Sequence, residues 1–212
     1  MDIGYFALGI GPLTNPEWIK PVATTAERLG FSSIWAPEHV VLLEQYASKY
    51  PYSAGEFPMP TYTPFADPFT TLAFAAACTS KIKIATGICL VPEHNPLVLA
   101  KTVATLDRLS GGRFILGVGI GWLAEEFQAL GLSFDRRAQR TREYIDVMRK
   151  LWREVWWWNW STLRCRVHGV SPTRFGSVSN QLSTDCPRRC SASTAGASSL
   201  SCGTPRAKFA QP

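Results

Sequence analysis

Hydrophobic residues between positions 81 and 122 follow a strand, helix, strand pattern. Residues 81–91 are apolar or β-branched at nearly every position, as in a strand covered on both faces. An Asn95-Pro96 pair then starts a helix, and two glycines at 111–112 end it. Residues 113–119 form a second apolar run, expected to be a buried strand. The pattern predicts a βαβ unit with parallel strands and a right-handed crossover.

The same alternation extends along most of the chain. Residues 2–7 and 32–36 are expected strands, and the expected helices cover 16–29, 68–77, 122–130 and 137–152. Apolar positions at helical spacing mark the faces expected to be buried: Ile19, Val22, Ala26, Leu29, Leu99, Val103, Leu106, Leu109, Ala138, Thr141, Ile145, Met148 and Trp152. Four consecutive βα units fit either a doubly wound sheet or the first half of an eight-stranded barrel.

One connection is unusually long. Residues 37–67 contain five prolines and four tyrosines and separate the second expected strand from the next helix. A loop of this length inside a compact domain is usually a lid or a binding loop. In both candidate architectures it leaves the carboxyl end of a strand, where ligands gather. The positions to inspect are therefore 9–11, 37–39, 87–91 and 119–122.

Composition limits the class of protein. The chain has 212 residues, of which 46% are hydrophobic, which is enough for one sizeable core. No apolar run reaches the length of a membrane span, and no secretory signal opens the chain, so a cytoplasmic address is expected. The net charge of +6 comes from residues 156–212, which carry seven basic residues against one acidic residue. A nucleic-acid partner is therefore not expected for the folded part.

Three runs resemble the luciferase-like monooxygenase superfamily, and within it the branch that uses the deazaflavin coenzyme F420. They are WAPEHV, DPFTTLAFAAACTSKIKIATGICLVPEHNPLVLAKTVATLDRLSGGRFILGVGIGWLAEEFQALG and RTREYIDVMRKLW. The resemblance covers residues 1–154. It implies an α/β fold of the (β/α)8 TIM-barrel type, here the first four βα units, with a flavin or deazaflavin at the carboxyl-terminal mouth.

The resemblance also implies the catalytic group. Glu38 and His39 match an acid-histidine pair beside the reactive carbon of the cofactor ring, with His39 catalytic and Glu38 on the cofactor. A histidine there can exchange a proton with the substrate atom that exchanges hydride. The alternative is that His39 only caps the strand or packs under a tyrosine of the long loop.

Further positions are carried over as cofactor contacts. Gly87-Ile88 matches a bulge with a non-prolyl cis peptide behind the ring, although an ordinary barrel bulge would fit the residues as well. Gly119, Ile120 and Gly121 are expected to line the cofactor, and Glu125 to make a polar contact with it. Trp122 stands where sugar-phosphate dehydrogenase members carry a carboxylate, so an apolar substrate wall is expected instead. No metal ligands are expected in this part.

The resemblance stops after Glu154. Residues 155–212 hold four tryptophans within five positions, ten serines and four of the six cysteines, without a hydrophobic period. A frameshift near residue 155 is the expected explanation, leaving a disordered tail. A zinc module built on Cys165, His168, Cys186 and Cys190 is the alternative.

Two functions stay open. The first is a flavin- or deazaflavin-dependent oxidoreductase, performing hydride transfer or monooxygenation on a small molecule, with F420 as cofactor and FMN as the alternative. The second is a non-catalytic half barrel with a basic, zinc-binding tail. A half barrel has open sheet edges, which favour a homodimer. Weak cofactor affinity is also expected, because the loops that grip the cofactor's phosphates in the family are absent. The sequence does not name the substrate.

Overall fold

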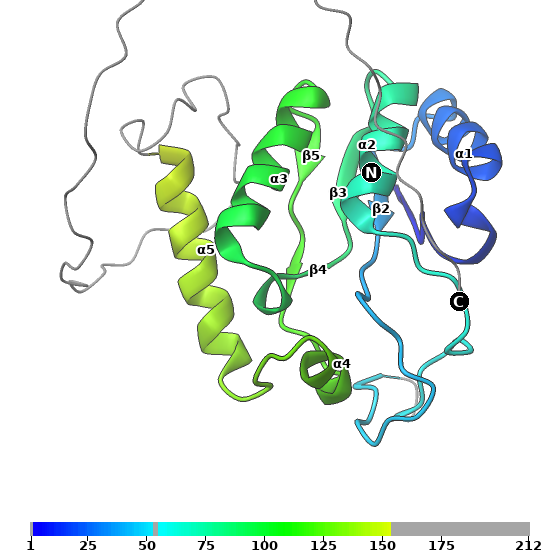
Figure 1. Ribbon diagram of the computed structural model, residues 1–212. Helices are drawn as coiled ribbons and strands as arrows, with labels where there is room; N and C mark the ends of the chain where they lie inside the picture. Colours follow the sequence, from blue (N-terminus) through cyan, green and yellow to red (C-terminus); the bar gives the residue numbers. More distant parts are fainter. Residues whose placement is uncertain (1, 53–54, 154–212) are drawn as a thin grey trace, which may run out of the picture. The chain divides into compact units, whose positions relative to one another are not determined.

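The computed structural model describes residues 2–52 and 55–153 of the chain. A parallel sheet has the strand order β1-β2-β3-β5, and a parallel pair is formed by β4 and β6 (Figure 1). The strands are β1 (Gly4–Phe6), β2 (Ser33–Ala36), β3 (Lys83–Thr86), β4 (Cys89–Leu90), β5 (Phe114–Ile115) and β6 (Val118–Gly119). The helices are α1 (Pro16–Arg28), α2 (Pro68–Cys78), α3 (Pro96–Leu109), α4 (Ala124–Ala129) and α5 (Arg137–Arg153). The expected order of βα units is confirmed.

The helix starts follow from local chemistry. Asn15, Asp67 and Asn95 each precede a proline, and each side chain accepts a hydrogen bond from an amide of the first helical turn. Such caps satisfy amides that have no partner within the helix, and proline in the first position costs no hydrogen bond. The three predicted helix starts are therefore confirmed.

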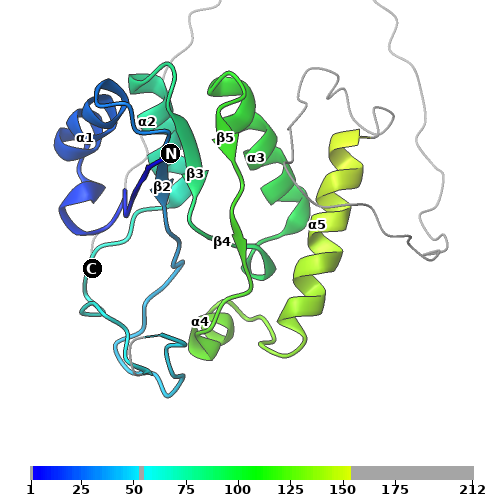
Figure 2. The same ribbon diagram turned by 180° about the vertical axis from the view of Figure 1, so that it is seen from behind.

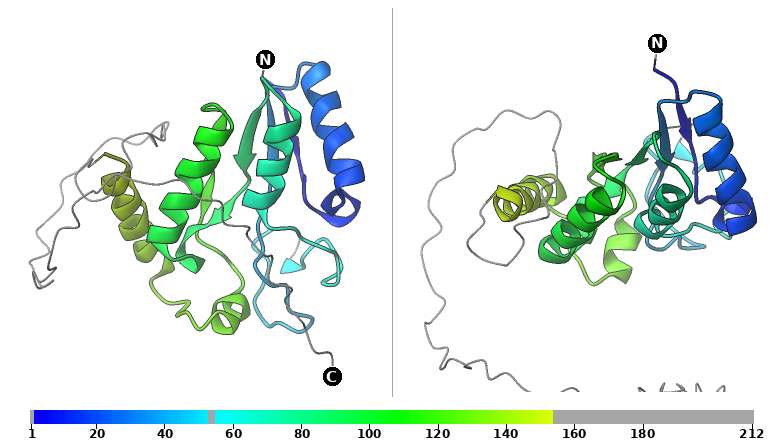
Figure 3. Two further views of the ribbon diagram at one scale, coloured as in Figure 1. Left: turned by 45° about the horizontal axis from the view of Figure 1, so that its top comes forward. Right: turned by 90° about the horizontal axis from the view of Figure 1, so that it is seen from above.

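Helices α1, α2, α3 and α5 form a row along one side of the strands (Figures 2 and 3). A doubly wound sheet would carry helices on both faces, so this arrangement is that of a partial (β/α) barrel. The core lies between the helix row and the sheet and contains Ile34, Leu72, Ile84, Leu99 and Met148, all at most 2% exposed. Among the described helices, none combines the length and apolar character that crossing a bilayer requires.

Three predicted core positions are wrong. Leu29 is 62% exposed, Leu109 is 73% exposed, and Ala138 is exposed as well. Leu29 and Leu109 stand at the carboxyl ends of their helices and Ala138 in the first turn of α5, so helical spacing alone does not bring them against the sheet. The predicted strand 113–119 is also less buried than expected, since Val118 is 42% exposed and no described element covers it.

The third and fourth strands are both interrupted. Between β3 and β4 the peptide bond Gly87-Ile88 is cis, as the resemblance implied. Gly117 separates β5 from β6; its carbonyl accepts hydrogen bonds from the amide of Cys89 and the hydroxyl of Thr86, both at 2.8 Å. A Cβ at Gly117 would lie 2.2 Å from the Thr86 carbonyl oxygen, so only glycine fits this crossing. The expected tail at 155–212 lies outside the described residues.

Candidate functional site

His39 lies just beyond β2 and pairs with a carboxylate far away in the sequence. Its Nδ1 is 2.9 Å from Oε2 of Glu126 in α4, and the two side chains are 9% and 1% exposed. The other oxygen of Glu126 accepts hydrogen bonds from the amides of Val40 and Val41, at 2.6 and 3.0 Å. A carboxylate oxygen only accepts hydrogen bonds, so the proton between Glu126 and His39 lies on Nδ1. The Nε2 atom of His39 is then free to exchange a proton with a substrate.

Glu38 and His39 are neighbours in the chain but have different partners. Glu38 Oε1 lies 2.9 Å from Nε2 of His94, and Oε2 accepts the amide of Leu90 at 2.5 Å. Neighbouring residues of an extended chain point to opposite sides, so Glu38 and His39 reach different partners. Glu38 is 5% exposed with both oxygens engaged, and it anchors β4 and the start of α3. Its contact with the cofactor stays a prediction.

Aromatic rings surround His39. Phe57, Phe65 and Trp122 present their edges or faces to the imidazole, with ring centroids 5.3, 5.6 and 6.1 Å away. Trp122 stacks on Phe57 at 5.9 Å and meets Tyr50 edge-on at 5.1 Å. The histidine therefore packs beneath two phenylalanines and a tryptophan rather than a tyrosine. The long loop supplies most of these rings, as a binding loop would.

The long loop is fastened at several points. Glu125 Oε1 accepts the amides of Ala47 and Ser48 at 2.7 and 3.1 Å. The hydroxyl of Ser48, together with these amides, outweighs desolvation and lowers the pKa of Glu125 to about 2. The far end of the loop bonds to the first turn, with the amide of Ala66 on the carbonyl of Gly9 at 2.9 Å. Glu125 is thus a loop anchor, and its predicted contact with the cofactor is untested.

Glu93 is an unusual buried acid. It is 8% exposed, and both carboxyl oxygens are buried without a hydrogen-bond partner among the described residues. Burial, and then the charges of Glu126 and Glu38, raise the pKa of Glu93 to about 9. Glu93 is therefore a neutral carboxylic acid at pH 7, lying between the two histidine–glutamate pairs.

Glycines allow neighbouring side chains to pack closely at the cis bulge. A Cβ at Gly87 would lie 3.1 Å from the ring of Phe6, and a Cβ at Gly119 would lie 1.7 Å from Cδ1 of Ile88. The apolar side chains of this region are partly exposed, with Phe6 at 57%, Ile88 at 41% and Ile120 at 42%. Gly121 has a φ of 73° and packs against Phe127 and Glu93. The site therefore offers backbone and apolar surface to a planar ring.

Sequence analysis missed Glu126, Glu93 and His94. A signal for Glu126 was present, because Leu123, Glu126 and Phe127 fall at helical spacing and are 1%, 1% and 0% exposed. That spacing distinguishes the inward Glu126 from its neighbour Glu125. No local pattern marks Glu93 or His94 as part of the site, because the groups that act on them, Glu38 and Glu126, lie far away in the sequence.

Comparison with known proteins supplies the family. Residues 1–175 match the family model described as luciferase-like monooxygenase. The chain is 38% identical over 148 residues to the uncharacterized protein Rv0953c of Mycobacterium tuberculosis, covering 68% of this chain and 52% of that protein. The chain thus spans about half the length of the curated relatives it matches.

Solved structures agree. Monooxygenase RslO1 from Streptomyces bottropensis superposes with a TM-score of 0.56 and 31% identity, covering 73% of this chain and 44% of that one. An F420-dependent secondary alcohol dehydrogenase, solved with an F420-acetone adduct, gives a TM-score of 0.56 and 29% identity over 72% of this chain and 42% of its own. The chain belongs to the luciferase-like monooxygenase family.

Proposed function

We propose that this chain carries the ring-binding and proton-transfer part of a deazaflavin-dependent oxidoreductase that interconverts an alcohol and a carbonyl compound. The observation that carries the proposal is the His39–Glu126 pair, which lies beyond β2 among aromatic rings. The F420-dependent alcohol dehydrogenase among the similar structures supports F420 and this substrate class. FMN is the alternative cofactor.

The residues present fit a flat cofactor ring. Gly87, Ile88, Gly119 and Ile120 would hold it, because the glycines let side chains pack closely around the cis peptide and the isoleucines expose apolar surface. When bound there, F420 supplies hydride exchange, and FMN supplies hydride exchange and oxygen activation.

His39 would act on the substrate proton. Its Nε2 would take the hydroxyl proton as an alcohol is oxidised and return it to the oxygen in the reverse direction. Glu126 keeps the ring in one tautomer and stabilises the positive charge when Nε2 is protonated. Trp122 and Phe57 cover this side with apolar surface, which favours an apolar substrate and excludes water.

Cofactor titration tests the proposal. A chimera that joins residues 1–154 to the carboxyl-terminal half of a relative is titrated with F420 and with FMN, and cofactor fluorescence is followed. We expect the chimera to quench the fluorescence of F420 and to turn over secondary alcohols. The 212-residue chain should bind F420 more weakly than the chimera. The variant Leu29→Ala, at an exposed helix end, is the control. If neither cofactor changes its fluorescence, the non-catalytic alternative replaces the proposal.

A further inference from the structure

Three side chains with metal-binding chemistry meet behind the cis bulge. Glu38 follows β2, Cys89 belongs to β4 and His94 precedes α3, yet one ligand atom of each lies within 4.8 Å of the others. Thiolate sulfur, imidazole nitrogen and carboxylate oxygen are the three donor types that zinc takes in proteins. No metal ligands are expected here from the sequence, since Glu38 and Cys89 lie 51 positions apart and no local spacing reveals the cluster.

The spacing is close to what a tetrahedral cation needs. Ligand bonds of about 2.0–2.1 Å to nitrogen and oxygen place two such atoms about 3.3 Å apart, and a bond of about 2.3 Å to sulfur extends that to about 3.5 Å. His94 Nε2 and Glu38 Oε1 are 2.9 Å apart. A cation between them would widen this pair by only about half an ångström.

The surroundings already orient the ligands. The amide of Leu90 donates to Oε2 of Glu38, which fixes the carboxylate and leaves Oε1 for a cation. Cys89 is 0% exposed and Glu38 is 5% exposed, so the ligands are held by packing.

A neighbouring group also lacks a partner. Glu93 is 8% exposed, and both of its carboxyl oxygens are buried without a hydrogen-bond partner among the described residues. It directly precedes His94, so a buried polar group without a partner stands beside the proposed ligands.

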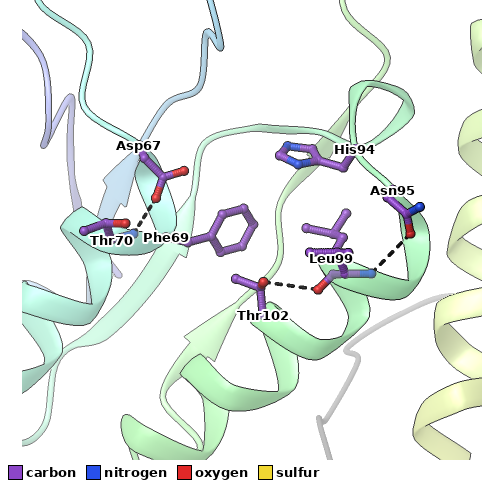
Figure 4. Close-up of a pocket in the computed structure, with 8 residues that line it drawn as sticks. Asp67, Phe69, Thr70, His94, Asn95, Leu99 and Thr102 are labelled. Atoms are coloured by element: carbon purple, nitrogen blue, oxygen red, sulfur yellow. Dashed lines mark hydrogen bonds between the residues drawn. The ribbon is translucent and has the colours of Figure 1, made fainter. Parts of the chain in front are cut away.

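One of the three side chains, His94, lines a pocket. A pocket of about 380 Å³ is lined by Asp67, Phe69, Thr70, His94, Asn95 and Thr102 among others (Figure 4). The His94 side chain is 25% exposed, whereas the Glu38 side chain behind it is 2% exposed. The acidic Asp67 lines the same pocket, so a cation would approach from the side of a carboxylate.

We propose that Glu38, Cys89 and His94 bind a divalent transition-metal cation of the zinc type, with the fourth position open to water from this pocket. Three protein ligands and one open position are a usual zinc arrangement. The ion would join the end of β2, strand β4 and the start of α3, directly beside the Gly87-Ile88 bulge. The proposal is independent of the proposed function.

Cobalt(II) replaces zinc spectroscopically and tests the site. The full chain is prepared with Cys165, Cys186, Cys190 and Cys202 changed to serine and His168 changed to glutamine, so that residues 155–212 offer no thiolate. We expect one cobalt per chain, a thiolate-to-cobalt charge-transfer band in the near ultraviolet, and loss of that band when zinc is added. In this background Cys89→Ser should abolish the band, and Cys78→Ser, the matched control, should retain it.

A second variant guards against misfolding. His94→Gln changes a partly exposed ligand and should weaken cobalt binding at least about tenfold, with far-ultraviolet circular dichroism confirming the fold. No band in the background protein, or a band that survives Cys89→Ser, overturns the proposal.

Discussion

Replacing Glu93 with glutamine is expected to remove a pH-dependent loss of stability. The pKa of Glu93 is about 9 in the folded chain, raised first by burial and then by the charges of Glu126 and Glu38. Its ordinary value is 4.5. Between these values the folded state holds one proton more than the unfolded state, so the free energy of unfolding falls as pH rises from 4.5 toward 9. Below pH 4.5 this loss is absent.

The magnitude follows from the proton count. One proton corresponds to a slope of about 1.4 kcal/mol per pH unit, which gives at most about 2.7 kcal/mol between pH 6 and pH 8. Because the Glu93 carboxyl group is partly screened by solvent, we expect a change in the free energy of unfolding of about 2 kcal/mol over this interval. Glutamine has nearly the same shape as glutamic acid and cannot release a proton. Between pH 6 and pH 8, the free energy of unfolding of Glu93→Gln should therefore fall by about 2 kcal/mol less than that of the wild type.

Urea unfolding at pH 6 and pH 8, followed by far-ultraviolet circular dichroism, measures the difference. His94 also contributes to the wild-type profile. Burial lowers its pKa, but the hydrogen bond and charge of Glu38 outweigh burial, so its stabilising contribution is lost as pH rises through the raised value. Only the difference between variants isolates Glu93. Glu17→Gln, on the exposed first turn of α1, is the control. Parallel pH profiles for wild type and Glu93→Gln would refute the reasoning.

Three further predictions concern the loop and the bulge. Glu126→Ala leaves the amides of Val40 and Val41 without their acceptor, at a cost of about 1–3 kcal/mol, and should speed their hydrogen exchange; unchanged exchange contradicts this. Gly119→Ala places a Cβ 1.7 Å from Ile88 and should lower the melting temperature by several degrees, whereas an unshifted melting curve would show that β4 and β6 yield freely. Glu125 has a pKa of about 2 against an ordinary 4.5, so its ionised carboxylate stabilises the loop fully above pH 4.5. This stabilisation is lost as pH falls toward 2. Hydrogen exchange of the Ala47 amide should therefore rise in that range in the wild type but not in Glu125→Gln.

Local patterns predicted the elements well, and distant contacts poorly. Helix starts at Asn15, Asp67 and Asn95 rest on chemistry within four residues of the cap, so the sequence contains all that is needed. The carboxylate partner of His39 lies 87 residues away in α4, and its identity depends on how the long loop folds over that helix. No periodicity reports such a contact.

Residue type alone does not tell the roles of two neighbouring glutamates apart. Glu125 and Glu126 are the same residue at consecutive positions, but α4 turns one toward the amides of the long loop and the other toward His39. Similarly, nothing in the sequence around Glu38 indicates that its side chain bonds to His94, 56 positions further along the chain. The cis bond at Gly87-Ile88 was anticipated only through the family resemblance.

The role of His39 is the central claim, and the steady-state rate of the chimera tests it most directly. With F420 and a secondary alcohol, His39→Gln should lower kcat at least about tenfold, since positioned acid-base groups contribute about 10²–10⁴-fold. The Kd for F420 should stay within about twofold, because the substitution leaves the residues around the Gly87-Ile88 bulge unchanged. An unchanged kcat in that variant would contradict the account and leave His39 as a packing residue.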